Sequence, residues 1–202
     1  MLVPKLKFKR EDGSDYPDWE EKPIGKYARI FDGVHQTPNY IESGVPFVSV
    51  EDIESLEYPT KYISAEDYER DFKTKSQKDD ILMTRIGDVG RTAIVPSDGY
   101  AYYVSLALIK PFDNINNVFL CQAMKNDFFQ RELWEYTIHT AFPKKINAGD
   151  IQYCKISIPA DIEEQQKIAD FLFAYDETIS CAKQELEYWK QLKKGLLQQM
   201  FV

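Results

Sequence analysis

Residues 161–201 read DIEEQQKIADFLFAYDETISCAKQELEYWKQLKKGLLQQMF, and this stretch decides the fold of the C-terminal part of the chain. It contains no proline and only one glycine, Gly195. Mostly apolar side chains recur at alternating steps of four and three residues, at Ile168, Leu172, Tyr175, Ile179, Ala182, Leu186, Trp189, Lys193, Leu196 and Met200. Such a repeat of about 3.5 residues is typical of a coiled-coil seam. We therefore predict one long coiled-coil helix over residues 161–202, roughly 60 Å in length at about 1.5 Å per residue.

The start of this segment and its irregular positions refine the prediction. Asp161, followed three residues later by Glu164, is typical of a capping box at the beginning of a helix. The seam is interrupted at Ala182 and Lys193, and Gly195 costs about 1 kcal/mol of helix propensity. A helix of this length cannot bury its stripe alone, so we expect a partner helix to cover it. The alternative is a long helix buried in the core of its own globule.

Composition bounds the class of protein. The 202 residues are enough for one domain with an extension or for two small domains. No apolar run reaches the roughly eighteen residues of a membrane span, and the N-terminal region lacks the apolar run of a signal peptide. The three cysteines are far apart, which favours buried free thiols and a cytoplasmic location. The net charge of −8 predicts weak, salt-dependent binding to DNA by the chain alone, because phosphates attract lysine and arginine.

The first 160 residues have a different pattern. Short segments rich in β-branched and aromatic residues predict strands at Tyr27–Phe31, Val45–Val50, Asp80–Arg85, Arg91–Pro96, Tyr100–Ile109 and Tyr153–Ile158. Helices are predicted at Ala65–Phe72, with Ser64 as its cap, and at Val118–Glu135. These elements favour the α+β class, with a globule over residues 1–160 that contains a bent, mainly antiparallel sheet. The boundary with the long helix is expected near Pro159–Asp161.

The sequence carries no recognisable catalytic constellation. The chain has only two histidines, His35 and His139, and it contains no Walker loop, Rossmann fingerprint, zinc-protease motif or serine-hydrolase motif. The segment Pro17–Lys22 reads PDWEEK, which superficially matches the PD…ExK signature of metal-dependent nucleases. Its acidic residues are almost adjacent, whereas that signature places them on separate paired strands. We therefore expect no enzymatic activity and no metal or cofactor of the chain's own.

Three polar segments are candidates for a binding surface. The turn Arg85–Arg91 holds two glycines three residues apart, as in a tight hairpin. The loops 31–40 and 136–145 concentrate polar and basic side chains that can contact base edges and phosphates. The candidate DNA-binding residues are His35, Gln36, Thr37, Asn39, Arg85, Asp88, Arg91, Thr140, Lys144 and Lys145. The alternative for each segment is an ordinary hairpin or a solvated loop.

Several strings together resemble a known family. EEQQKIADFL at 163–172 follows an IxIP strand end at Pro159, and the helix ends in LKKGLLQQMF at 192–201. Upstream, DWE at 18–20, DGVHQTP at 32–38, DDILMTRIGDVG at 79–90 and FPKK at 142–145 agree. Over essentially the whole chain, the combination resembles the DNA specificity (S) subunits of type I restriction–modification systems.

The resemblance implies a target recognition domain that reads one half of a split double-stranded DNA site. It also implies that the helix packs antiparallel against a second helix and docks modification (methyltransferase) subunits, while methyl transfer and cleavage belong to other subunits. The residues expected at the helix contact are Ile168, Leu172, Tyr175, Ile179, Leu186, Trp189, Leu196 and Met200.

The number of parts departs from that family pattern. A typical S subunit has two recognition domains and two such helices, whereas this chain has one of each. It therefore resembles a half-subunit: a natural short form, a phase-variable or truncated gene product, or an excised piece. A homodimer, or pairing with a different S chain, would restore the two-domain layout.

A second function class stays open at this point. A coiled-coil scaffold or inhibitor, whose globule binds protein rather than DNA, is the alternative, and the net acidity favours it. A mobility-shift experiment with duplex DNA, with and without a modification subunit, separates the two classes.

Overall fold

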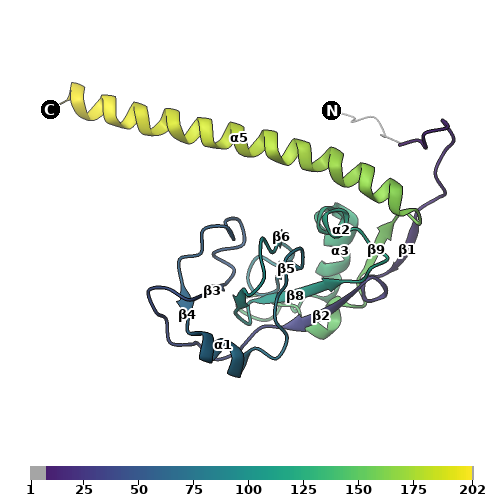
Figure 1. The fold of residues 1–202 in the computed structure, drawn as a ribbon, viewed down its shortest axis with the longest axis horizontal. Helices are drawn as coiled ribbons and strands as arrows, with labels where there is room; N and C mark the ends of the chain where they lie inside the picture. Colours follow the sequence, from purple (N-terminus) through teal and green to yellow (C-terminus); the bar gives the residue numbers. More distant parts are fainter. Residues whose placement is uncertain (1–7, 202) are drawn as a thin grey trace.

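The computed structural model describes residues 8–201. Figure 1 shows a globule of small sheets and short helices, from which one long helix, α5 (Ile162–Met200), extends as an arm. The predicted α+β class and the predicted long C-terminal helix are confirmed. Within the described part of the chain, no helix is both long enough and apolar enough to cross a membrane.

The largest sheet has four strands, and every neighbouring pair in it is antiparallel. Their order is β2 (Ala28–Asp32), β8 (Leu106–Pro111), β5 (Ile81–Thr84) and β6 (Thr92–Ile94). Because β8 lies between β2 and β5 and runs against both, β2 and β5 point in the same direction. The C-terminal ends of β2 and β5 therefore lie at one edge of the globule, where the candidate loops begin.

Two smaller sheets complete the strand set, in place of the single bent sheet that was predicted. One joins β4 (Tyr62–Ile63) to β3 (Val45–Val48) antiparallel, and β3 to β7 (Ala101–Tyr102) parallel. The other pairs β1 (Glu20–Pro23) with β9 (Lys155–Ile158) antiparallel. The pairing of these strands is thus mainly antiparallel, as expected from the sequence.

The four-stranded sheet separates two hydrophobic cores. Because side chains alternate between the faces of a strand, Ile81 and Met83 enter one core and Leu82 enters the other. The first core is covered by α2 (Asn117–Met124) and α3 (Asp127–Tyr136). With both faces covered, all four residues of β5 are buried.

The remaining short elements close the two cores. The second core lies between the four-stranded sheet, the sheet of β3 and β7, and helix α1 (Ala65–Asp71). A 3₁₀ turn at Ile24–Lys26 and helix α4 (Ala148–Ile151) contribute Ile24 and Ile151 to the first core.

Capping explains where the structure departs from the predicted helices. The helix predicted over Val118–Glu135 is two helices, α2 and α3, because Asn126 interrupts it as an N-cap. Its side-chain oxygen accepts from the backbone N–H groups of Phe128 and Phe129, at 2.7 and 3.3 Å. Asparagine is among the most favoured residues at this position. Ser64 caps α1 as predicted, accepting from the N–H three residues later at 3.0 Å.

One strand prediction was wrong in detail, and the strands β1 and β4 were missed. The strand predicted over Tyr100–Ile109 is divided by a turn at Val104–Ser105, because β7 pairs with β3 whereas β8 pairs with β2 and β5. Strand β1 was not predicted. Its sequence, EEKP, has neither β-branched residues nor an apolar alternation, and its extended shape is provided by pairing with β9.

The first two turns of α5 belong to the globule. Ile168 and Ala169 are buried in the first core. The Gln165 side chain, 2% exposed, accepts from the backbone N–H of Asn116 and donates to the carbonyl of Pro159, both at 2.9 Å. Because both ends of this buried amide are satisfied, Gln165 fixes the direction in which the arm leaves the globule.

The predicted capping box at the start of α5 forms only in part. The Asp161 carboxylate accepts from the N–H of Glu163 at 3.0 Å, as a cap should. Glu164 does not complete the box. Its side chain is buried and accepts from the indole N–H of Trp19 at 3.2 Å. The segment before β1 thus supports the start of the arm, and Arg10 adds an ion pair to Asp161 at 3.1 Å.

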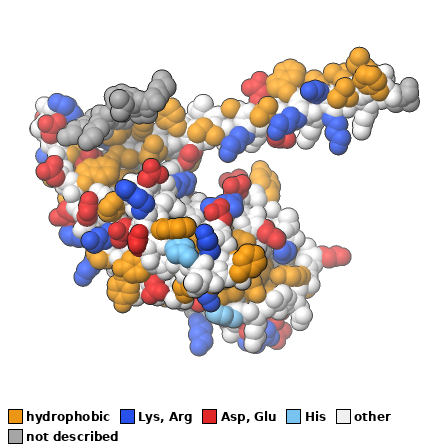
Figure 2. Space-filling model, turned by 180° about the vertical axis from the view of Figure 1, so that it is seen from behind, with side chains coloured by type: hydrophobic (Ala, Val, Ile, Leu, Met, Phe, Trp, Pro, Cys, Tyr) orange, Lys and Arg blue, Asp and Glu red, His pale blue; other side chains and the backbone are white. Residues whose placement is uncertain are grey.

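Beyond Ala169 the arm leaves the core. The predicted contact residues from Leu172 to Met200 are 37–73% exposed, and Figure 2 shows apolar side chains along the arm. The alternative of a helix buried in its own globule is therefore wrong for this chain.

Thiol labelling tests the two environments. The expectation of three buried cysteines was wrong, because Cys181 on the arm is exposed. Burial raises the pKa of the Cys154 thiol to about 12 and also raises the pKa of Cys121. Because their pKa values are raised, the thiols of Cys121 and Cys154 are protonated at pH 8, and burial also shields them from the reagent. Only the thiolate form of a cysteine reacts, so both should stay unlabelled. We expect one thiol per native chain to react with Ellman's reagent and three after denaturation. Cys181→Ser should remove the native signal; rapid labelling of that variant would contradict the burial.

Candidate functional site

A buried arginine joins the three candidate segments. Arg85, which follows β5, is 5% exposed, and its guanidinium forms an ion pair with Asp32 and donates to the carbonyl of Ile146 at 3.2 Å. Its own carbonyl accepts from the N–H of Ile146 at 2.9 Å. Asp32 ends β2 just before the loop His35–Asn39, and Ile146 directly follows the loop Thr140–Lys145. Arg85 therefore ties both loops to the hairpin that it begins.

This position corrects the expectation that Arg85 is a surface contact. Removing a guanidinium from water is costly unless its charge is paired and its donors are used. Asp32, whose side chain is 40% exposed, supplies the charge, while one guanidinium nitrogen, Nε, has no partner among residues 8–201. Arg85 therefore holds the loops of the candidate surface in place and is not itself exposed on that surface.

The loop that ends at Lys145 is fixed at its base and open at its tip. The N–H of Ile138 donates to the carbonyl of Lys145 at 2.7 Å, and the N–H of Gly87 donates to the carbonyl of Lys144 at 2.8 Å. Both lysine side chains are exposed, and Phe142 is fully exposed. The loop thus presents two ammonium groups and one aromatic ring from a backbone that is held on both sides.

Trp134 adds an aromatic surface that the sequence analysis missed. Its ring lies 3.9 Å from that of His139, whose Nε2 is 2.9 Å from the Trp134 carbonyl. The Lys144 ammonium lies 4.7 Å from the Trp134 ring, a cation–π contact. The only signal in the sequence is that Trp134 lies off the apolar face that Phe129 and Leu133 form on this helix.

The loop His35–Asn39 contributes polar side chains at the same edge of the globule. His35, Gln36, Thr37 and Asn39 are exposed, and His35 Nε2 lies 3.3 Å from an Asp32 oxygen. Both histidines of the chain are visible, in pale blue, on the face shown in Figure 2, with lysine and arginine side chains around them.

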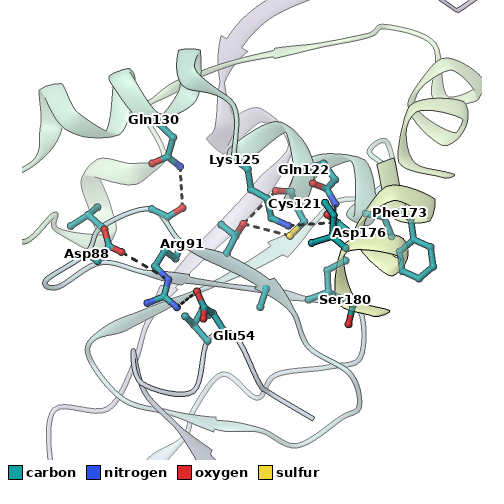
Figure 3. A pocket seen from close by; sticks show the side chains of 18 of the residues that line it. Glu54, Asp88, Arg91, Cys121, Gln122, Lys125, Gln130, Phe173, Asp176 and Ser180 are labelled. Carbon is teal, nitrogen blue, oxygen red and sulfur yellow. Dashed lines mark hydrogen bonds and ion pairs between the residues drawn. The ribbon is translucent and has the colours of Figure 1, made fainter. Parts of the chain in front are cut away.

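Arg91 and Asp88 have a different setting. They line a cavity of about 910 Å³ between the globule and the arm, which Figure 3 shows with Phe173 and Ser180 of α5. The Arg91 guanidinium forms an ion pair with Glu54 at 2.8 Å and lies 4.0 Å from the Asp88 carboxylate. To contact DNA, Arg91 would have to exchange these carboxylates for a base or a phosphate.

The described residues at this edge carry charged, polar and aromatic side chains. Among residues 8–201, no group of three or more His, Cys, Asp or Glu side chains could hold a metal ion. In the nuclease-like segment, Asp18 is exposed and Glu20 pairs with Lys22 on β1. What the edge offers is ammonium groups for anions, polar loop side chains for hydrogen bonding, and aromatic faces for stacking.

Comparisons with known proteins agree in one family. Residues 18–188 match the family model described as type I restriction modification DNA specificity domain. The MjaX specificity subunit of a type I restriction enzyme from Methanocaldococcus jannaschii is 24% identical over 205 residues, which cover 96% of this chain and 48% of that protein. This chain thus spans slightly less than half the length of that relative.

Solved structures share the fold. A chain from a structural study of complex assembly and conformational transition of the type I R-M system has a TM-score of 0.65 and 21% identity, over 87% of this chain and 43% of that one. The HsdS subunit from Thermoanaerobacter tengcongensis has a TM-score of 0.62 and 22% identity, over 85% and 41%.

Replacing Arg85 tests its structural role. Arg85→Ala leaves Asp32 without its charge partner and frees both loops, so we expect the free energy of unfolding to fall by about 2–4 kcal/mol. This is somewhat less than for a fully buried pair, because Asp32 is partly solvated. Urea unfolding followed by circular dichroism measures the change. Arg131→Ala, on the exposed side of α3, is the control and should change stability by less than about 0.5 kcal/mol. Equal stability of the two variants would contradict the role.

Proposed function

Because the chain belongs to the family of type I restriction modification DNA specificity domains, we propose that it recognises one half of a split double-stranded DNA site in the cytoplasm. The observation that supports this most directly is the edge of the globule built around Arg85. There, two polar loops, one of which carries the exposed Lys144 and Lys145, are held in place by the ion pair between buried Arg85 and partly exposed Asp32 and by backbone hydrogen bonds. Rigid placement of polar side chains is what base recognition requires.

Each part of the edge has a proposed role. Lys144 and Lys145 contact phosphates and set the position of the loop on the duplex. The loop His35–Asn39, together with Thr140, supplies donors and acceptors for base edges. Trp134 and Phe142 offer aromatic faces to sugars or bases. These assignments rest on exposure and on the placement of the loops.

The arm is proposed to serve assembly. Its exposed seam is covered by α5 of a second copy, or of a different specificity chain, in antiparallel orientation, and modification subunits dock along the pair. In this proposal the chain has no catalysis of its own, and methyl transfer and cleavage belong to other subunits. Two globules at opposite ends of paired arms would read the two halves of the split site.

Duplex binding separates this proposal from a protein-binding scaffold. Fluorescence anisotropy with a random-sequence duplex, with and without a modification subunit, should show affinity that falls steeply with salt. Methylation mapped across the genome of a host with and without this chain should reveal a split motif that depends on it. A chain that binds no DNA in either setting would favour the scaffold.

Removing the two loop lysines tests the phosphate contacts. The Lys144→Ala/Lys145→Ala variant should bind all duplex sequences more weakly, and the slope of log K against log salt should decrease in magnitude by about 1 per lysine. Anisotropy over a salt series measures the slope. The control is Lys26→Ala/Lys78→Ala, which removes the same charge from exposed positions near the opposite ends of β2 and β5. If both variants change the slope equally, the loop is not the contact.

Arg91 tests base recognition separately. If its guanidinium leaves Glu54 and forks onto guanine, Arg91→Ala should relax the methylated motif at one base pair, at a cost of about 1–3 kcal/mol in discrimination. Genome-wide methylation mapping in a host with the modification subunit reads the motif directly. An unchanged motif would confine Arg91 to the cavity beside the arm.

A further inference from the structure

The spacing along the arm defines a pairing register. Alternating steps of four and three read the same in both directions, so an antiparallel copy matches every seam position with another. The facing pairs are Ile168 with Met200, Leu172 with Leu196, Tyr175 with Lys193, Ile179 with Trp189, and Ala182 with Leu186. A shift of one heptad leaves two seam positions of each helix unmatched. In the unshifted register, small Ala182 meets Leu186 next to the two-fold axis, and Trp189 meets the smaller Ile179.

Charge on the arm favours the antiparallel direction independently of any resemblance. Residues 161–180 contain six acidic residues and one lysine, whereas residues 181–201 contain four lysines and two glutamates. A parallel pair would place the two acidic halves side by side, and an antiparallel pair places each acidic half against a basic one. In this register, Lys193 lies opposite Tyr175 and beside Asp176 of the second copy. The charged side chain of Lys193, which interrupts the apolar seam, then has an acidic partner in Asp176 of the second copy.

A pocket lies where the register places the far end of the second arm. Its volume is about 630 Å³, and it is formed by the segment before β1 and by the first turns of α5. Phe8, Trp19, Phe171 and Leu172 give it an apolar, mostly aromatic lining. The Phe8 and Phe171 rings meet edge to face at 5.6 Å, which holds the N-terminal wall against the helix.

We propose that this pocket is the seat for the C-terminal end of α5 from a second copy, in the register given above. Met200, 73% exposed, lies opposite Ile168 on the pocket wall, and Leu196, 49% exposed, lies opposite Leu172. The inference rests on the dimer in the proposed function and adds the site at which each arm ends. The segment before β1 thereby becomes part of the dimer interface.

Paired cysteines test the register. In a Cys181→Ser background, Leu172→Cys/Leu196→Cys should give a covalent dimer with a short bismaleimide, because each cysteine faces the other type across the seam. The single variants Leu172→Cys and Leu196→Cys should stay uncoupled, since in this register identical positions lie about 36 Å apart along the axis. Cys121 and Cys154 are buried and do not compete.

Other cross-linking patterns would overturn the register. Coupling of either single variant with itself indicates a parallel pair. Coupling of Leu172→Cys/Trp189→Cys in preference to Leu172→Cys/Leu196→Cys indicates a shift by one heptad. Light scattering on the unmodified chain separates the two levels of the proposal. If light scattering shows a dimer but cross-linking gives another pattern, only the register is refuted. If light scattering shows a monomer, the proposed dimer itself is refuted. DNA binding by the globule is measured in a separate experiment.

The seat itself is tested through Trp19, which lines the pocket and is 42% exposed. With Trp134→Phe and Trp189→Phe, Trp19 is the only indole, and acrylamide should quench it less in the dimer. Adding Met200→Asp should restore the quenching and shift the chain toward the monomer. Gln198→Asp adds the same charge on the outer face of the helix and should do neither. Trp19 quenching that is equal in the dimer and in the Met200→Asp variant would overturn the seat.

Discussion

The ion pair between Arg85 and Asp32 is the interaction on which the candidate surface depends. It bridges the ends of β2 and β5 across the start of β8, at the edge of the sheet where these two strands both finish. The same guanidinium reaches Ile146, so three loops from distant parts of the sequence share a single anchor. Loops on a rigid framework can vary in sequence without losing their positions. Such a design suits a surface that has to present different side chains from one fold.

A second constraint sets the direction of the arm. Gln165 is hydrogen-bonded to both Asn116 and Pro159, and the segment before β1 adds the contacts of Arg10 and Trp19 to the first turn. The helix therefore leaves the globule from a fixed socket rather than from a flexible linker. Globule and arm act as one rigid piece near their junction, so the spacing between two globules would follow from the length of the arm.

The sequence predicted the long helix, the α+β class and most strands, because these follow from local periodicity and composition. It misplaced features that depend on pairing between distant segments. Strand β1 has no local strand signal, and Arg85 looked like a free hairpin arginine because nothing nearby reveals Asp32. The apolar pattern on both sides of Asn126 favoured one continuous helix, whereas in the structure Asn126 caps the second of two helices. Trp134 belongs to the candidate surface because it contacts His139 and Lys144, and the sequence around Trp134 does not reveal these contacts.

The burial of Ile168 and Ala169 in the first core moves the practical limit of the globule past the end of β9. A fragment cut at Pro159 would lose the amide that bonds Asn116 and would expose the first core where these two side chains had covered it. Hybrids that join the globule of one such chain to the arm of another are better spliced within the solvated part of α5, after Ala169. There, a change of sequence alters only a seam that repeats along the helix, and the globule keeps the start of α5 that packs against it.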